Sequence, residues 1–369
     1  MAEAKQNEID LTRHALALAA QGVGLVSPNP LVGCVVVSAT GNIVGEGVYR
    51  FEQITHAEVT ALEQAGPRAQ GATAYVSLEP HDHHGKTPPC TDALINAGIA
   101  RLVCPIEDPN PLVSGKGFRR LSDAGIEVAT GILADEASRL NEKFICWHRN
   151  DRPFVHLKLA ISLDGRISLT RSVSTALSGT IAQERVQELR HEHDAILVGS
   201  GTTLADDPSL SDRSGLLRRR PLVRVVLDDR LRTPLNSKVS NPSAESPTIM
   251  FTNSANAEKI ACLRQQGVKI VAPEMGARDL KTVLDELKRR DIQSVLVEGG
   301  SEIAAAFIEA RLVDKISFIA APLIIGGTTA PTAIAGYGAS SLEEALRLRD
   351  ISTRALGDDI EITGYPSDR

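Results

Sequence analysis

The most constraining feature of this sequence is a regular alternation of short β-branched runs with helical patterns, broken once near the middle of the chain. After a first helix that ends near Gly22, the runs LVGCVVV and IVGEGVY flank the turn-forming residues 39–42 and predict a β-hairpin. From His56 onward, helical and strand patterns alternate. Such alternation is typical of a sheet flanked by helices, with sites at the strand ends where loops converge. The sequence therefore predicts an α/β fold.

The break in this alternation lies at residues 147–153, where polar residues cluster and Pro153 ends any helix. The strand pattern restarts directly afterwards with FVHLKLAIS. A chain of 369 residues is also long enough for about two domains of average size. We therefore expect two domains, 1–150 and 151–369.

Composition excludes several classes of protein. The chain has 40 Lys and Arg against 46 Asp and Glu, and only 3% of its residues are aromatic, so no basic, base-stacking surface for nucleic acid is expected. No apolar run approaches the ~20 residues that span a bilayer, and the N-terminus lacks the pattern of a signal peptide. The five cysteines are odd in number and widely spaced, as in proteins of a reducing compartment. We expect a cytoplasmic protein that binds neither membranes nor nucleic acid.

Histidines are clustered in the first half. Four of the nine, His56, His81, His83 and His84, precede Cys90 closely. Catalytic zinc needs neutral nitrogen or thiolate ligands and one open position, and a carboxylate that is not a ligand then moves protons. His56 suits the ligand role and Glu58 the carboxylate role, since both begin one expected helix. Cys90 opens another helix, whose dipole is expected to lower the pKa of its thiol.

The alternative is that the three later histidines form a solvated loop and Cys90 is a buried, inert residue. The combination favours a metal site, because zinc deaminases carry H-x-E followed by P-C-x-x-C. This chain has the first part and a longer second part.

The segments PNPLVGCVVV, HAEV, YVSLEP, HHGKTPPC and AGIARLV resemble the deaminase half of the bifunctional riboflavin-biosynthesis deaminase/reductases. The resemblance implies a zinc site of His56, His81 and Cys90, with Glu58 as the catalytic acid/base. His81 stands where the family pattern has Cys, which gives a His₂Cys donor set. By the same resemblance, Asn29 contacts the pyrimidine of the substrate.

The second half contains VLVEGGS, an apolar strand that ends in glycines and opens a helix, a weak indication of phosphate binding when taken alone. The segments LKLAISLDGRI and GSGTTLADDPSLSDR resemble the reductase half of the same family, which uses NADPH. The residues implied for the cofactor are Lys158, Ala160, Ala176, Thr202, Asp206, Asp229, Gly300 and Ser301. Those implied for the substrate are Ser174, Arg190, Leu210, Arg213 and Glu298. Ala176 stands where the family usually has Trp.

Taken together, the resemblance implies an N-terminal cytidine-deaminase-like α/β/α sandwich and a C-terminal dihydrofolate-reductase-like domain. The implied enzyme uses Zn²⁺ to deaminate 2,5-diamino-6-(5-phosphoribosylamino)pyrimidin-4(3H)-one, a small-molecule phosphoribosylaminopyrimidine, and then uses NADPH to reduce its ribosyl group to ribityl. A homodimer or higher homo-oligomer is expected.

Two alternatives remain at the level of sequence. One is a reductase with a structural N-terminal domain, motivated by His81 in place of Cys. The other is a cytidine- or tRNA-adenosine-type deaminase with an appended binding domain, against which the acidic balance of the chain argues.

Overall fold

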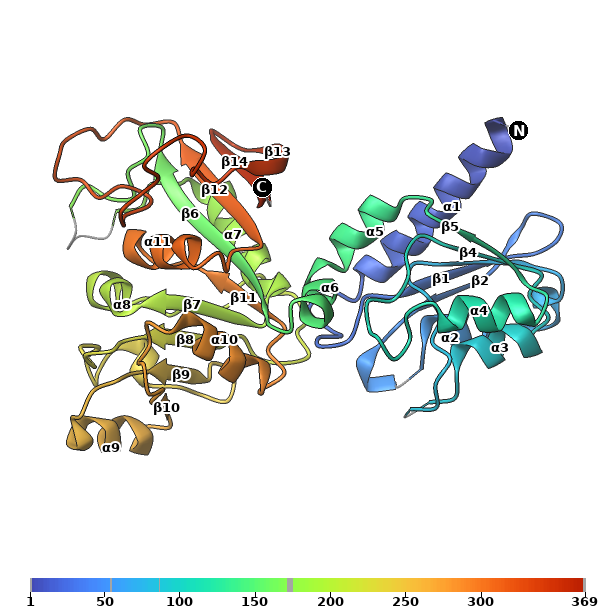
Figure 1. The fold of residues 1–369 in the computed structure, drawn as a ribbon, viewed down its shortest axis with the longest axis horizontal. Coiled ribbons are helices and arrows are strands. Elements are labelled where there is room, and N and C mark those ends of the chain that lie inside the picture. The colour runs from blue at the N-terminus through green and yellow to red at the C-terminus, as the bar shows by residue number, and fades with distance from the viewer. Residues whose placement is uncertain (1, 54, 86, 171–174, 368–369) are drawn as a thin grey trace. The chain divides into compact units, whose positions relative to one another are not determined.

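The computed structural model describes residues 2–53, 55–85, 87–170 and 175–367. The chain forms two compact units, Met1–Asp151 and Arg152–Arg369 (Figure 1). No helix in the described part of the chain is long and apolar enough to cross a membrane.

The first unit is built on a five-stranded sheet with the order β2-β1-β3-β4-β5. Its strands are β1 (Gly33–Val37), β2 (Ile43–Val48), β3 (Thr73–Val76), β4 (Arg101–Cys104) and β5 (Glu127–Thr130). β1 is antiparallel to β2, as the predicted hairpin requires, and also antiparallel to β3. β3, β4 and β5 are parallel.

Helices cover both faces of this sheet, which makes the unit an α/β/α sandwich (Figure 1). They are α1 (Ala2–Ala20), α2 (Ala57–Ala65), α3 (Cys90–Asn96), α4 (Lys116–Asp123), α5 (Ala134–Leu140) and α6 (Glu142–Arg149), with 3₁₀ helices at Phe51–Gln53 and Gly66–Ala69. Successive side chains of β1 point to opposite faces of the sheet. Val35 packs with Ala15 of α1 on one face. Val36 packs with Ala61 of α2 on the other face.

Two glycines of β2 fix the position of α2. A Cβ atom on Gly45 would lie 1.9 Å from the carbonyl oxygen of Ala61, and one on Gly47 would lie 1.9 Å from that of Ala57. Only glycine permits such an approach, so the helix rests directly on the strand. This contact positions the first turn of α2, where His56 and Glu58 lie.

The second unit is built on a nine-stranded sheet with the order β10-β9-β8-β7-β11-β6-β12-β14-β13. Its strands are β6 (Phe154–Ser162), β7 (Ala195–Gly199), β8 (Val223–Leu227), β9 (Thr248–Phe251), β10 (Lys269–Val271), β11 (Ser294–Val297), β12 (Lys315–Ala321), β13 (Leu348–Leu356) and β14 (Asp359–Pro366). The pairs from β10 to β12 are parallel, and β14 pairs antiparallel with β12 and β13.

The helices of this unit are α7 (Thr180–Glu192), α8 (Ser200–Asp206), α9 (Ala257–Gln265), α10 (Leu280–Lys288) and α11 (Ser301–Glu309), with a 3₁₀ helix at Lys238–Ser240. α8 follows β7 and α11 follows β11 at the same edge of the sheet (Figure 1). Along β6, Val155 and Leu157 belong to the main core with Phe307 of α11. The alternate residues His156 and Lys158 therefore lie on the opposite face of the sheet.

Candidate functional site

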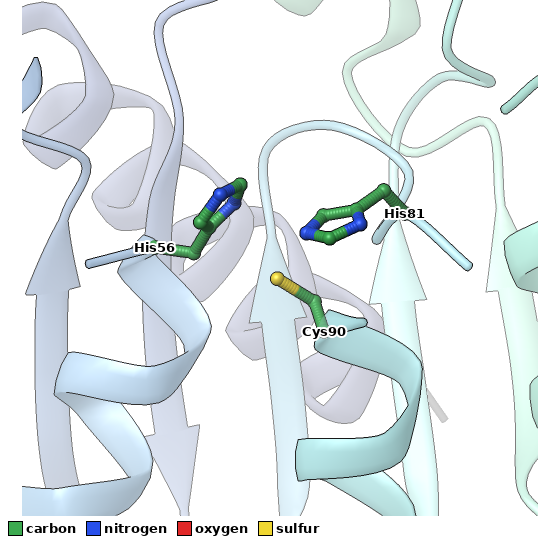
Figure 2. A group of neighbouring side chains, drawn as sticks. All are labelled: His56, His81 and Cys90. Carbon is green, nitrogen blue, oxygen red and sulfur yellow. The ribbon is translucent and has the colours of Figure 1, made fainter. Parts of the chain in front are cut away.

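Three side chains of the first unit come together at the ends of three elements. His56 directly precedes α2, His81 lies in the loop after β3, and Cys90 is the first residue of α3 (Figure 2). The nitrogen of each imidazole and the sulfur of the cysteine all lie within 4.8 Å of one another. The resemblance implies these three residues as zinc ligands, and the structure brings them to one point. His83 and His84 are exposed and lie outside this group.

The loop that carries His81 is attached to the start of α3. The backbone N–H of Thr91 donates to the carbonyl oxygen of His81 at 3.3 Å. The hydroxyl of Thr91 donates to Asp82 at 2.7 Å. Both bonds join the segment of one candidate ligand to the segment of the next, Cys90.

The orientation of the His81 ring follows from one hydrogen bond. Its Nδ1 lies 3.1 Å from the carbonyl oxygen of His83. A carbonyl oxygen only accepts, so Nδ1 carries the proton and Nε2 keeps its lone pair. Among the described residues, this buried Nε2 has no hydrogen-bond partner. The lone pair of His81 Nε2 is therefore available to bind a metal ion.

Electrostatics keep the metal-free group neutral. Burial, together with neighbouring His81, lowers the pKa of His56 to about 4. Burial raises the pKa of Glu58, whose carboxyl is hydrogen-bonded to the Cys90 thiol. Burial also raises the pKa of Cys90 well above its usual range, so the predicted lowering by the helix dipole is wrong for the metal-free chain. The physical reason is that desolvation of a nearly inaccessible thiol outweighs the field of a two-turn helix.

The donor set fits zinc. Two neutral imidazoles and one thiol are the ligand types that catalytic zinc takes, and three of them leave a fourth position open. Besides His81 Nε2, Oε2 of the buried Glu58 also lacks a hydrogen-bond partner in the described part of the chain. Buried polar atoms rarely remain unpaired, so both atoms are suited to interact with a bound zinc and its water.

Asn29 lies at the edge of the same group. Its side-chain amide donates to the hydroxyl of Tyr49 at 2.6 Å. The ring of Tyr49 in turn lies 5.3 Å from that of His56, measured between centroids. The proposed pyrimidine contact of Asn29 is thus compatible with its position and stays a prediction.

Glu79 is a residue of this site that the sequence analysis missed. It is 3% exposed, and its carboxylate accepts backbone N–H bonds from Asp108, Gly115 and Phe118 at 3.0, 3.0 and 3.2 Å. The available signal was a lone acidic residue directly after an apolar strand, two positions before His81.

In the second unit, the implied cofactor residues gather along one edge of the sheet. Parallel strands end at the same edge, and the residues there are Ala160, Thr202, Asp206, Asp229, Gly300 and Ser301, with Lys158 two positions before Ala160. Gly300 precedes α11, and a Cβ at this position would meet nothing within 4 Å. The open backbone at a helix N-terminus suits a phosphate, so this edge fits a dinucleotide.

Arg190 and Glu298 form a buried ion pair beside this edge. The guanidinium donates to both carboxylate oxygens, at 2.8 and 3.0 Å, and also to the carbonyl oxygen of Ser211 at 3.0 Å. Burial opposes ionisation of Glu298, yet Arg190 and Lys158 lower the pKa of this carboxyl. Burial lowers the pKa of the Lys158 amine, which is therefore easier to deprotonate than a surface lysine.

The remaining implied residues have contrasting surroundings. Arg213 is exposed, and its guanidinium donates to the neutral hydroxyl of Ser209 at 3.1 Å. The Leu210 side chain is 3% exposed and belongs to a hydrophobic cluster, so only its backbone is free to face a ligand. Asp229 accepts the N–H of Ala277 at 2.5 Å. Ala176 is exposed, and Ser174 lies outside the described residues.

Family models match both parts of the chain. Residues 5–106 match the cytidine and deoxycytidylate deaminase zinc-binding region. Residues 153–362 match the RibD C-terminal domain. Fold, donor set and these matches define a chain of the zinc-deaminase class joined to a reductase-type α/β domain.

Relatives with both parts are well represented among known proteins. The riboflavin biosynthesis protein RibD of Actinobacillus pleuropneumoniae is 40% identical over 96% of this chain and 94% of its own length. That of Aquifex aeolicus is 41% identical over 94% and 95%. The crystal structure of Acinetobacter baumannii RibD, form 1, is similar with a TM-score of 0.86 at 35% identity, covering 99% of this chain and 100% of that one.

A second solved structure, from Thermotoga maritima, is described as a diaminohydroxyphosphoribosylaminopyrimidine deaminase/5-amino-6-(5-phosphoribosylamino)uracil reductase. It has a TM-score of 0.86 at 34% identity, covering 99% of this chain and 100% of that one. The chain belongs to the RibD family of riboflavin biosynthesis proteins.

Proposed function

We propose that this chain catalyses two consecutive steps of riboflavin synthesis. The first is hydrolytic deamination of 2,5-diamino-6-(5-phosphoribosylamino)pyrimidin-4(3H)-one, and the second is NADPH-dependent reduction of the ribosyl group to ribityl. The observation that carries the proposal is the convergence of His56, His81 and Cys90 beside buried Glu58 in a chain that also has a RibD C-terminal domain.

In the first step, His56, His81 and Cys90 hold zinc, which when bound supplies the Lewis acidity that makes a water acidic near neutral pH. Glu58 accepts the proton of the attacking water and delivers it to the departing amine. The raised pKa of Glu58 suits this exchange, because a carboxyl that titrates closer to neutral pH both takes and gives a proton readily. Asn29 holds the pyrimidine beside the His56 segment.

In the second step, the carboxyl edge of the large sheet binds NADPH, which when bound supplies the hydride. The residues that would hold the cofactor are Lys158, Ala160, Ala176, Thr202, Asp206, Asp229, Gly300 and Ser301. Arg213 receives the substrate phosphate, because its guanidinium is exposed, donates to the neutral hydroxyl of Ser209 and lies close enough to Glu298 to lower the pKa of that carboxyl. Arg190 and Glu298 act as a pair that fixes the substrate beside Lys158, and Ser174 and the backbone of Leu210 complete its contacts.

Two further properties are part of the proposal. The chain acts in the cytoplasm, which its five free cysteines support. It assembles as a homodimer or higher homo-oligomer, which the edge strand β13 supports, since most of its residues are exposed and an unpaired edge favours pairing with a second copy. The net charge of −6 argues against a nucleic-acid partner.

Incubation of the purified protein with the diaminopyrimidine phosphate tests the proposal. Ammonia release without NADPH, followed by NADPH oxidation in equal amount when the cofactor is added, is the expected result. Reduction of the separately supplied deaminated compound without any ammonia release from the diamino compound would instead establish a reductase with a structural N-terminal unit.

A further inference from the structure

α4 contributes no candidate ligand, yet its first turn is attached to the segment that carries His81. The attachment is made by Glu79, whose buried carboxylate lies at the N-terminal end of this helix.

Glu79, which is distant in sequence, accepts hydrogen bonds from backbone N–H groups at the N-terminal end of α4 that have no partner within the helix. Gly115, the N-cap residue, has no side chain to offer, and its N–H donates to Oε2 of Glu79 at 3.0 Å. The N–H of Phe118 donates to Oε1 at 3.2 Å. A carboxylate at this end also interacts favourably with the helix dipole.

Steric contact reinforces these bonds. A Cβ on Gly117, in the first turn of α4, would lie 1.9 Å from the carbonyl oxygen of Pro80. The helix backbone therefore packs directly against the residue that precedes His81. A third N–H, that of Asp108, donates to Oε2 and joins the loop after β4 to the same carboxylate.

The next turn of α4 carries Arg120, which forms ion pairs with a neighbour of each of two candidate ligands. Arg120 lies 3.9 Å from Asp82, which follows His81, and 3.4 Å from Asp92, which follows Cys90 by two positions. These exposed ion pairs are individually weak. Together with Glu79 they connect one rigid helix to both ligand-bearing segments.

We propose that Glu79 is a positioning residue for the metal site, acting by fixing α4 against the segment Pro80–His81. This rests on the proposed function, since it presumes that His56, His81 and Cys90 hold zinc. Glu79 is not one of the three candidate ligands. Its three accepted N–H bonds hold the loop after β3 against α4, and so fix the backbone of His81 and the position of Nε2 of its ring.

The test measures metal binding in the full-length chain with zinc in competition against a chromogenic chelator, and with Co²⁺ as a spectroscopic probe. Glu79→Ala removes all three accepted bonds and is expected to weaken zinc binding about 10–100-fold, the usual effect of losing a group that orients ligands. Its Co²⁺ absorption spectrum is expected to shift and lose intensity in the visible d–d bands. Glu79→Gln retains one carbonyl oxygen at the Oε2 position and is expected to restore most of the affinity.

Asp279→Ala is the matched control, because Asp279 caps α10 in the second unit through the N–H and hydroxyl of Thr282. It removes a helix-capping carboxylate and is expected to leave zinc binding and the Co²⁺ spectrum unchanged. Arg120→Met removes only the exposed ion pairs of α4 and is expected to lower zinc affinity less than Glu79→Ala does. Urea unfolding followed by the fluorescence of Trp147, which lies in α6 of the first unit, verifies that this unit is folded in each Glu79 and Arg120 variant.

Failure of the positioning role and failure of the proposed function give different results. A parent protein that binds zinc, with Glu79→Ala equal to it in affinity and Co²⁺ spectrum, overturns the positioning role and leaves the proposed function standing. A parent protein that binds no zinc overturns the proposed function and the positioning role with it. A loss of zinc affinity in Glu79→Ala that is accompanied by unfolding of the first unit in the Trp147 signal would reduce the role of Glu79 to general stability.

Discussion

The two candidate sites of this chain differ in whether their key buried polar groups have hydrogen-bond or ion-pair partners. In the first unit, Nε2 of His81 and Oε2 of Glu58 are buried without a hydrogen-bond partner in the described residues. In the second unit, the charged residues of the candidate site are largely paired, since Arg190 pairs with Glu298 and Asp229 accepts the N–H of Ala277, while Oδ1 of the neighbouring Asp228 is buried without a partner in the described residues.

This difference indicates how each site depends on its ligand. The first unit leaves donor atoms unpaired at one point, so a cation there completes the structure. In the second unit, Arg190 and Glu298 already neutralise each other, so we expect its ligands to depend more on exposed groups such as Arg213 and on open backbone such as Gly300. The pKa directions agree with this distinction, since burial raises that of Glu58 whereas Arg190 and Lys158 lower that of Glu298 against burial.

The largest effect is expected for Glu58→Gln. The amide keeps the shape of the side chain but cannot transfer a proton, so ammonia release should fall about 10²–10⁴-fold while zinc content is retained. Glu63→Gln, an exposed position on the same helix, is the control and should release ammonia at the parent rate. Near-parent activity of Glu58→Gln would remove Glu58 from the acid/base role.

Loss of the middle ligand comes next. His81→Ala leaves two of three donors, so zinc affinity should fall more than about 100-fold, beyond the usual effect of an outer-shell change. His81→Cys should preserve or raise the affinity, because thiolate is an equally suitable ligand. Titration with a competing chelator measures both.

The control for this pair is His83→Ala, which removes an exposed imidazole and keeps the carbonyl oxygen that orients His81. If His83→Ala lost zinc and His81→Ala kept it, the ligand would be His83.

Arg213→Ala examines the second unit. One charge-assisted phosphate contact contributes roughly 1.5–3 kcal/mol, so the KM for the phosphoribosyl substrate should rise about ten- to a hundredfold. The KM for NADPH should hardly change. Steady-state kinetics with each substrate varied separately decides this, with Arg349→Ala on β13 as the control for loss of one exposed arginine. If Arg213→Ala instead weakened NADPH binding and left the substrate KM unchanged, Arg213 would belong to the cofactor side of the proposed site.

The smallest effect concerns Asp108. Burial raises the pKa of its carboxyl to about 7, so between about pH 4 and pH 7 the folded state holds a proton that the unfolded state has released. Stability therefore falls as pH rises through this window. Asp108→Asn keeps the acceptor for the N–H of Asn110 and removes the charge, so it should stabilise the first unit above pH 7 by on the order of 1 kcal/mol and change little below pH 4.

Urea unfolding followed by the fluorescence of Trp147, the single tryptophan and part of α6, measures this difference. Asp123→Asn, an exposed position on α4, is the control. A stability difference between Asp108→Asn and the parent that does not vary with pH would contradict the assigned cause.

The α/β class and the hairpin of the first unit could be predicted from sequence, because β-branched runs and turn residues such as Gly41 act locally. The residue types of the metal group were also predictable, since the chemistry of zinc restricts them. The acidity of Cys90 was not, because burial of its thiol is set by packing that no local pattern reveals. The role of Glu79 was not predictable either, because the residues that donate to its carboxylate follow it in sequence by 29 to 39 positions.

The central claim is that the chain holds zinc through His56, His81 and Cys90. X-ray absorption at the zinc edge, on protein purified without chelator and containing one zinc per chain, tests it most directly. The account predicts one sulfur neighbour at about 2.3 Å and nitrogen or oxygen neighbours at about 2.0–2.1 Å, two of them imidazoles. Less than about a tenth of an equivalent of zinc, or a shell with no sulfur or with more than one, would contradict it.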